Sequence, residues 1–328
     1  MRRYPVEVAL LPARCGIIFV PMEEIQPPPK VSAVVVSWNN AAALRRCLGA
    51  LERSTGRENM EVVVVDCGSH DESPLLDAEF PKITMLRLPR NFGIVKALNI
   101  GMRTAKGDYY LFLPPEVEVQ PDTVAALAAQ LEATAEAAAV APLLLSPEGD
   151  VLTRHRRVPL PDEAYRAWRA GDFADWTTPA CDVDALPVEF LNVAVLMARA
   201  NFLKGMRYID ERYGNSCWDL EVCCQIRRAS KRVLLLPNVV ATLHAAPPAA
   251  IYPAMRAQFA ADRVLGIVTY AGKHFGLGAG MKTRLLATLS VLGAAMASLV
   301  TFRDTRYCFS LLSCLLSGQK IDGSQSAL

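Results

Sequence analysis

Two glutamates follow an apolar run that ends in a pair of prolines. Glu116 and Glu118 come directly after residues 109–113 and Pro114-Pro115, and the run 109–113 is typical of a short central strand. In open α/β sheets the ligand crevice lies outside the carboxyl ends of the strands. Carboxylates at such a place can bind a divalent metal or a reacting group. The spacing therefore predicts a ligand-binding edge here.

A second acidic pair, Asp219 and Glu221, lies where an amphipathic helix is expected to begin. Residues two apart on a helix do not share a face, but both can lean toward a cleft at its first turn. Asp219 also fits a purely structural role as a helix cap, stabilised by the helix dipole. His244 follows the last expected strand and is open to either a structural or a binding role.

The elements that would position these acids alternate as strand and helix from Val31 onward, which predicts a parallel, right-handed α/β sheet. We expect Asn40 to cap the first helix, Gly107 to cap the helix before residue 109, and an alanine-rich helix over 122–135. The expected strands are 33–37, 62–65, 83–88, 109–113, 139–145, 189–198 and 233–236.

Three regions are expected along the chain: a poorly ordered leader (1–30), an α/β domain (31–245) and a helical C-terminal region (246–328). Between two strands, residues 146–187 are weakly periodic and read as a long functional loop. Its basic cluster 154–157 fits either a solvated face or a contact with an anionic acceptor.

Composition excludes several classes of protein. The 328 residues carry 35 basic and 33 acidic side chains, a net charge of +2 without long runs of one sign, so nucleic-acid binding is not expected. The nine cysteines lie mostly in apolar runs without a CxxC pair, which indicates reduced, buried thiols in a cytosolic protein. The mean hydropathy of +0.20 is high for a soluble protein and indicates contact with a membrane.

The candidate for that contact is residues 285–302, a stretch of 18 residues without charge, followed by the apolar run 307–316. This length is near the lower limit for spanning, so a shallow or hairpin association fits as well as a transmembrane helix. A helical pair packed on the α/β domain is the alternative. The cations that flank these runs are expected to contact an anionic cytoplasmic leaflet; they are Lys282, Arg284, Arg303, Arg306 and Lys320.

Four blocks occur together in order: VSAVVVSWNNAAALRRCLGAL, VVVVDCGSHDES, NFGIVKALNIGMRTAKGDYYLFLPPE and IDERYGNSCWDLEVCCQIRRASKRVLLLP. Over about residues 31–245 they resemble the family 2 glycosyltransferases, inverting enzymes with the GT-A fold, and among them the bacterial rhamnosyltransferase-like members. The resemblance implies a mostly parallel Rossmann-like sheet flanked by helices. Four positions depart from the family pattern: Pro114, Glu116, Val193 and Trp218.

The resemblance also implies roles for individual residues. It places the catalytic base at Asp219, with Glu221 beside it, and a divalent cation, Mg²⁺ or Mn²⁺, at Glu116, Glu118 and His244. Lys96 is either a contact to a phosphate oxygen or an ordinary surface lysine. The positions that match nucleotide-sugar contacts are Ser37, Asn39, Asp66, Gly68, Asn91, Gly93, Lys96 and Asn99.

The function implied is transfer of a hexosyl or deoxyhexosyl group from a nucleotide-sugar donor to a hydroxyl of a glycan or lipid-linked acceptor, in cell-surface polysaccharide synthesis. The expected location is the cytoplasmic face of the inner membrane, through a peripheral or shallowly inserted C-terminal region. Such chemistry requires Glu116 and Asp219 to meet in one pocket. A catalytically degenerate nucleotide-binding or interaction module is the alternative; a dinucleotide oxidoreductase is excluded because SWNNAA replaces a GxGxxG turn.

Overall fold

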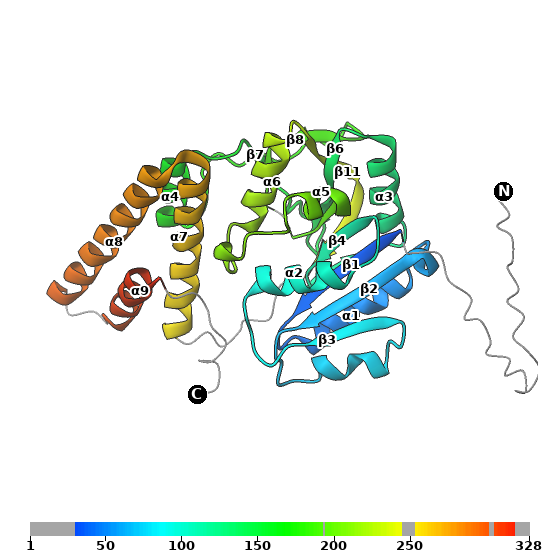
Figure 1. The fold of residues 1–328 in the computed structure, drawn as a ribbon, viewed down its shortest axis with the longest axis horizontal. Helices are drawn as coiled ribbons and strands as arrows, with labels where there is room; N and C mark the ends of the chain where they lie inside the picture. Colours follow the sequence, from blue (N-terminus) through cyan, green and yellow to red (C-terminus); the bar gives the residue numbers. More distant parts are fainter. Residues whose placement is uncertain (1–29, 193, 245–252, 302–304, 319–328) are drawn as a thin grey trace, which may run out of the picture.

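The computed structural model describes residues 30–192, 194–244, 253–301 and 305–318 (Figure 1). The expected leader, apart from Lys30, and Val193 therefore lie outside the described residues. The strands are β1 Val31–Ser37, β2 Met60–Asp66, β3 Ile83–Arg87, β4 Tyr109–Leu113, β5 Val117–Val119, β6 Ala137–Leu145, β7 His155–Arg156, β8 Leu186–Val188, β9 Phe190–Leu191, β10 Leu196–Arg199 and β11 Arg232–Leu243. The α-helices are α1 Ala41–Glu52, α2 Ile94–Thr104, α3 Thr123–Ala133, α4 Pro161–Ala170, α5 Ala200–Gly205, α6 Trp218–Arg228, α7 Pro253–Phe275, α8 Leu277–Val300 and α9 Arg306–Ser317, and short 3-10 turns cover Arg57–Asn59, Ser73–Ala78 and Glu211–Tyr213.

One mixed sheet carries the domain, with the strand order β3-β2-β1-β4-β10-β6-β11-β5 and with β8 paired to β11. Strands β1 to β4 run parallel, as the alternation of strand and helix predicts, and β6 runs parallel to β11. Strand β10 lies antiparallel between β4 and β6, and β5 and β8 are antiparallel to β11. A small second sheet pairs β7 with β9.

Helices cover both faces of this sheet (Figure 1). On one face Leu44 of α1 and Leu127 of α3 belong to a buried cluster that also contains alternate residues of β1 such as Val35. On the other face α2, α5 and α6 pack around Val34 and Phe112. Strands buried on both faces explain the unbroken apolar runs in β2 and β4, because neither face of a covered strand meets water.

Gly107 does not cap a helix, contrary to the expectation. Helix α2 ends at Thr104 with Ala105 as its C-cap, and Gly107 instead lies against the start of β1. A Cβ at this position would lie 2.7 Å from the backbone nitrogen of Ser32. The Gly107 N–H donates to the Ser32 hydroxyl at 2.8 Å, so the glycine is required for close approach of two backbones.

Replacing Gly107 with alanine should therefore destabilise the domain by about 1–3 kcal/mol, the usual cost of forcing atoms into a packed core. Chemical denaturation of the variant and the parent measures this. Gly205→Ala is the matched control for the loss of a glycine, because a Cβ at that position would meet no atom within 4 Å and Gly205 does not have a positive φ. Equal unfolding midpoints for parent and Gly107→Ala would contradict the close approach.

Two further expectations need correction. Residues 146–187 are not only a loop, because they contain β7 and the amphipathic helix α4. The expected strand 189–198 is two separate strands: β9 joins the small sheet, and β10 enters the main sheet antiparallel to β4. The break between them carries Asn192, whose side chain accepts from the Arg154 N–H at 2.6 Å.

The C-terminal region is helical, as expected, and forms a three-helix group beside α4 (Figure 1). Helix α7 packs against α4 and the domain, whereas α8 has a mean hydropathy of 1.6 and is only 22% buried over its most apolar window. Within the described residues, α8 is the one helix long and apolar enough to cross a membrane. Helices α8 and α9, which contain the two apolar runs, pack against α7 and against each other, and their contact with a membrane stays a prediction.

Candidate functional site

The loops after β1 and β2 are joined by hydrogen bonds at the sheet edge. Asn39 adopts a left-handed conformation (φ 50°), and its side-chain oxygen accepts from the His70 N–H at 2.8 Å. The Asn39 N–H donates to the Ser69 hydroxyl at 2.8 Å, and the Ser69 N–H donates to Asp66 at 3.0 Å. The side chain of Asn39 is thus used to shape the loop.

Two buried oxygens at this edge have no partner among the described residues: Asp66 Oδ1 and Ser37 Oγ. Both residues are 1% exposed. A buried polar atom without a hydrogen bond is costly, so such atoms point to a ligand or a water that completes them. These two positions therefore fit the predicted nucleotide contacts.

Glycines bring the next two loops close to the same edge. Gly68 has φ +71°, and a Cβ there would lie 2.7 Å from Arg90 Cα. Gly93 has φ +87°, and its N–H donates to the Asn91 side chain at 2.9 Å. Only glycine adopts such backbone geometry without strain, so both glycines are explained by the loop conformation alone.

The other two predicted nucleotide contacts differ in exposure. Lys96 is exposed, with its Nζ 4.4 Å from the centre of the Phe92 ring, and remains available to a phosphate. Asn99 is 1% exposed and binds both the N–H and the C=O of Ile209. Asn99 therefore ties α2 to the segment before α6, and the expected direct contact with a nucleotide is not supported.

A pocket of about 660 Å³ opens where β4 and β11 end, here called the Glu116 pocket. The Glu116 carboxylate accepts from the Asn40 side chain at 2.6 Å. Asn40 occupies the N-cap position of α1, as expected, but its side chain makes no capping hydrogen bond to the helix and instead holds Glu116 across the sheet edge. The pocket is lined by Ile94, Leu98, Phe112, Leu113, Pro114, Glu116, Ser146, Pro147, Glu148, Leu152, Ala194, Trp218, Leu243 and His244.

His244 lies in this pocket because β11 pairs with β5 and its own N–H donates to the Glu116 carbonyl at 2.9 Å. The His244 ring nitrogen Nε2 lies 3.1 Å from Glu118, whose other oxygen accepts from Arg53 at 3.2 Å. Glu118 does not line the pocket and supports His244 from behind.

These donors fit a divalent cation in part. No group of three or more His, Cys, Asp or Glu side chains poised for a metal occurs within the described ranges. Mg²⁺ and related hard cations are commonly held by one or two protein ligands together with phosphate oxygens and waters. Glu116 and His244 can supply those two ligands, so the pocket fits a cation that arrives with a diphosphate.

Asp219 lies in a second pocket of about 330 Å³, here called the Asp219 pocket. Burial raises the pKa of Asp219 to about 6, although the Leu220 N–H and the Arg263 charge favour the ionised form. A carboxylate with such a pKa is a suitable general base near neutral pH. Five aromatic residues line the same pocket: Trp168, Phe173, Trp176, Phe190 and Trp218.

The expectation of one common pocket for Glu116 and Asp219 is not met, because the two acids line different pockets, both of which are also lined by Trp218. Its indole packs edge-on against Phe112, with ring centres 5.8 Å apart. The two acids nevertheless lie on neighbouring pockets that share one wall.

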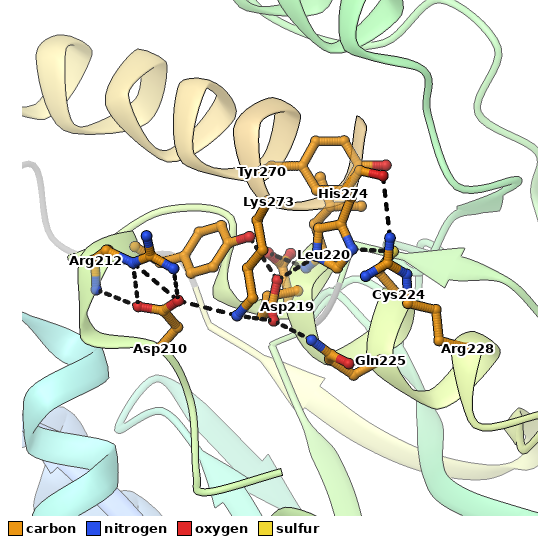
Figure 2. A network of polar contacts seen from close by, with 12 residues as sticks. Asp210, Arg212, Asp219, Leu220, Cys224, Gln225, Arg228, Tyr270, Lys273 and His274 are labelled. Atoms are coloured by element: carbon orange, nitrogen blue, oxygen red, sulfur yellow. Dashed lines mark hydrogen bonds and ion pairs between the residues drawn. The ribbon is translucent and has the colours of Figure 1, made fainter. Parts of the chain in front are cut away.

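Glu221 instead contacts Lys273 and His274, which belong to the polar network shown in Figure 2. It is 0% exposed and accepts from Lys273 at 2.7 Å and from Tyr213 at 2.6 Å, with the His274 ring 2.6 Å away. Burial alone would raise the pKa of Glu221, but hydrogen bonds from His274, Lys273, Tyr213 and Gln225 lower the pKa to about 2. This geometry favours a structural role for Glu221 over the predicted catalytic one.

Helix α7, which carries Lys273 and His274, also supports the start of α2 through Asp262. The Asp262 carboxylate is 1% exposed and accepts from the Asn215 N–H at 2.9 Å, while Asn215 accepts from the Ile94 N–H at 2.7 Å. Asn215 thus links α7 to the first turn of α2. Sequence reasoning missed Asn215, Asp262 and Arg263, because no local pattern shows that α7 returns to the sheet edge.

A mixed sheet with helices on both faces and with polar loops gathered at its strand ends defines a GT-A glycosyltransferase domain. A mannosyltransferase from Pyrobaculum calidifontis, solved with GDP-Man and Mn²⁺, superposes with a TM-score of 0.52 at 18% identity, covering 90% of this chain and 89% of that one. Residues 32–181 match the family described as glycosyl transferase family 2.

Curated relatives agree with this assignment. An N-acetylglucosaminyltransferase of Sinorhizobium fredii is 28% identical over 151 residues, which are 44% of this chain and 37% of that relative. An N-acetylglucosaminyl-diphospho-decaprenol L-rhamnosyltransferase of Mycobacterium tuberculosis is 24% identical over 262 residues, 74% of this chain and 84% of that protein. The chain thus aligns with little more than a third of the first relative and with most of the second.

Proposed function

We propose that this chain is an inverting glycosyltransferase that moves a hexosyl or deoxyhexosyl group from a nucleoside-diphosphate sugar to a hydroxyl of a lipid-linked or glycan acceptor. The observation that supports this is the pair of neighbouring pockets. One holds Glu116 and His244 beside the orphaned oxygens of the nucleotide edge, and the other holds a half-buried Asp219 with a raised pKa.

The leaving group of such a reaction is already a diphosphate, so no acid is needed to protonate it. Asp219 accepts the proton of the acceptor hydroxyl as that oxygen attacks the anomeric carbon, and the bond to the diphosphate oxygen breaks. Attack from the side opposite the diphosphate inverts the configuration. A divalent cation, when bound at Glu116 and His244, supplies positive charge to the departing diphosphate.

The metal proposal predicts that EDTA lowers turnover at least about 10-fold and that Mn²⁺ restores it. Glu118→Gln should raise the Mn²⁺ concentration needed for half-maximal activity by about 10–100-fold, because Glu118 orients His244 without lining the pocket. Glu148→Gln is the control, since Glu148 lines the same pocket without contacting His244. Full activity in EDTA would refute the metal role.

A second candidate is a nucleotide-binding module without transfer, and one observation favours it: Glu116 and Asp219 line separate pockets that share Trp218. Incubation of the purified chain with a panel of nucleoside-diphosphate sugars separates the two. Release of nucleoside diphosphate, alone or with transfer to an acceptor, supports the transferase. Thermal stabilisation by nucleoside diphosphates without turnover of any donor supports the binding module.

The proposed place of action is the cytoplasmic face of the inner membrane. The support is the outward apolar face of α8, where Leu285 is 60% exposed and Met296 is 54% exposed. Lys282 and Arg284 lie near the start of this helix, where an anionic leaflet would attract them. Peripheral or shallow insertion of α8 and α9 accounts for this surface.

A further inference from the structure

A third hollow lies between α4 and the C-terminal helices, here called the helical groove, with a volume of about 460 Å³. This lies within the range of about 300–1,000 Å³ found for small-molecule sites. Two of its residues, Trp168 and Arg263, also line the Asp219 pocket, so the two hollows meet there. Its other lining residues are Arg169, Phe259, Ala260, Ser290, Val291, Ala294, Tyr307, Cys308 and Leu311.

The chemistry changes in steps along these two hollows. The outer part of the groove lies between α8 and α9, whose outward side chains are apolar, and Phe259 and Tyr307 are 40% and 38% exposed. Two arginines, Arg169 and Arg263, stand in the middle. The inner part is the Asp219 pocket with its aromatic walls.

Both arginines are exposed, and the charge of Arg263 also favours the ionised form of Asp219. Across the described segments, neither the Arg169 nor the Arg263 guanidinium forms a hydrogen bond or ion pair with a protein side chain. By contrast, Arg156 and Arg157 of the basic cluster are both paired with Glu163. Guanidinium groups bind phosphate oxygens in a bidentate fashion, so a free pair at a pocket junction suits a diphosphate.

We propose that the helical groove binds the isoprenoid diphosphate part of a lipid-linked saccharide acceptor. The isoprenoid chain lies between α8 and α9, the diphosphate contacts Arg169 and Arg263, and the first sugar reaches Asp219 past Trp168. The proposal rests on the proposed transferase function and narrows its acceptor to one chemical class. A free glycan would leave both the apolar groove and the arginines without a partner.

The order of these parts also matches the position of the membrane. An acceptor anchored in the bilayer must leave it between the helices that contact lipid, and the groove opens between those helices. Arginines at the level of the headgroups then receive the diphosphate. The domain thereby takes a lipid-anchored substrate without removing the chain from an apolar environment.

Farnesyl diphosphate, a short isoprenoid diphosphate, is the probe. Titration calorimetry with the full chain should show binding that Arg263→Gln weakens by about 10-fold or more, since a charge-assisted contact is lost. Ala294→Trp fills the groove and should weaken binding similarly. Arg166→Gln, an exposed arginine of the same helix α4 that lines neither hollow, should leave affinity within about twofold.

Arg169→Gln gives a second reading at an exposed position, in case Arg263→Gln or Ala294→Trp fails to fold. Unchanged affinity in the folded variants, or equally tight binding of inorganic pyrophosphate, would overturn the proposal. Nucleoside-diphosphate thermal shifts on the same samples separate the groove from the transferase function. If nucleoside diphosphates stabilise the chain but farnesyl diphosphate does not bind, only the proposed acceptor site in the helical groove is refuted. If farnesyl diphosphate binds but no donor is turned over, the transferase assignment is refuted.

Discussion

Asp219→Asn is expected to lower turnover by about two to four orders of magnitude, because general-base catalysis contributes about that much. The amide keeps the size and the hydrogen bond to the Leu220 N–H but cannot accept the proton of the acceptor hydroxyl. Binding of the donor should survive, since none of the predicted nucleotide contacts lines the Asp219 pocket. Steady-state kinetics combined with nucleoside-diphosphate binding measures both quantities.

The pH dependence provides a second reading of the same residue. Burial raises the pKa of Asp219 to about 6, so the base is protonated below this pH and turnover should rise as pH increases through about 6. Stability changes in the opposite direction to turnover, because the folded state binds this proton more tightly than the unfolded chain does. The contribution of Asp219 to the free energy of unfolding therefore decreases as pH rises from its unfolded pKa to about 6.

Asp172→Asn is the matched control for the lost charge, because Asp172 lines the same pocket as Asp219 but is exposed. Its turnover should stay within a few-fold of the parent, since an asparagine oxygen can still accept from the Trp176 indole, as the carboxylate does at 2.8 Å. Near-normal turnover in Asp219→Asn would remove Asp219 from the mechanism.

The N-terminal half of the fold could be predicted because its signals are local. Each strand of β1, β2 and β4 is a continuous apolar run, and each following helix has one apolar face, so element type and order follow from periodicity. Strand β10 was harder, because it is four residues long and antiparallel. Its pairing depends on a chain reversal that no short pattern encodes.

The site divides in the same way. Glu116 and Asp66 follow strands directly, so their place at the sheet edge could be predicted from the parallel order. The partners that hold them are distant in sequence: Asn40 lies 76 residues from Glu116. Whether Glu221 faced a cleft or the core depended on α7, because an acid at a helix start looks the same in sequence until its partner is known.

Helix α7 therefore acts as part of the catalytic domain and not as a separate appendage. Through Asp262 it holds Asn215, through Arg263 it borders the Asp219 pocket, and through Lys273 it reaches Glu221. All three contacts converge on the segment that precedes or begins α6. The position of Asp219 is thus tied to the same helix that leads into the apolar helices α8 and α9.

Glu221→Ala should make this dependence visible by lowering the free energy of unfolding by about 3–5 kcal/mol, the usual loss when one partner of a buried ion pair is removed. The substitution leaves Lys273 and His274 facing each other in the core without the carboxylate that accepts from both. Chemical denaturation measures the loss. Asp162→Ala, which breaks the exposed Lys282–Asp162 pair between α8 and α4, should cost at most about 1 kcal/mol.

The pH dependence of stability distinguishes this charge from a simple loss of packing. Burial raises the pKa of Glu221, but its four hydrogen bonds lower the pKa to about 2 in the folded state. Its stabilising effect is therefore complete above the unfolded pKa of about 4.3 and is lost as pH falls toward 2. The parent should lose stability over this interval, and Glu221→Ala should lose less. Parallel losses in both proteins would show that the network contributes through shape alone, and α6 would then not depend on the charge of Glu221.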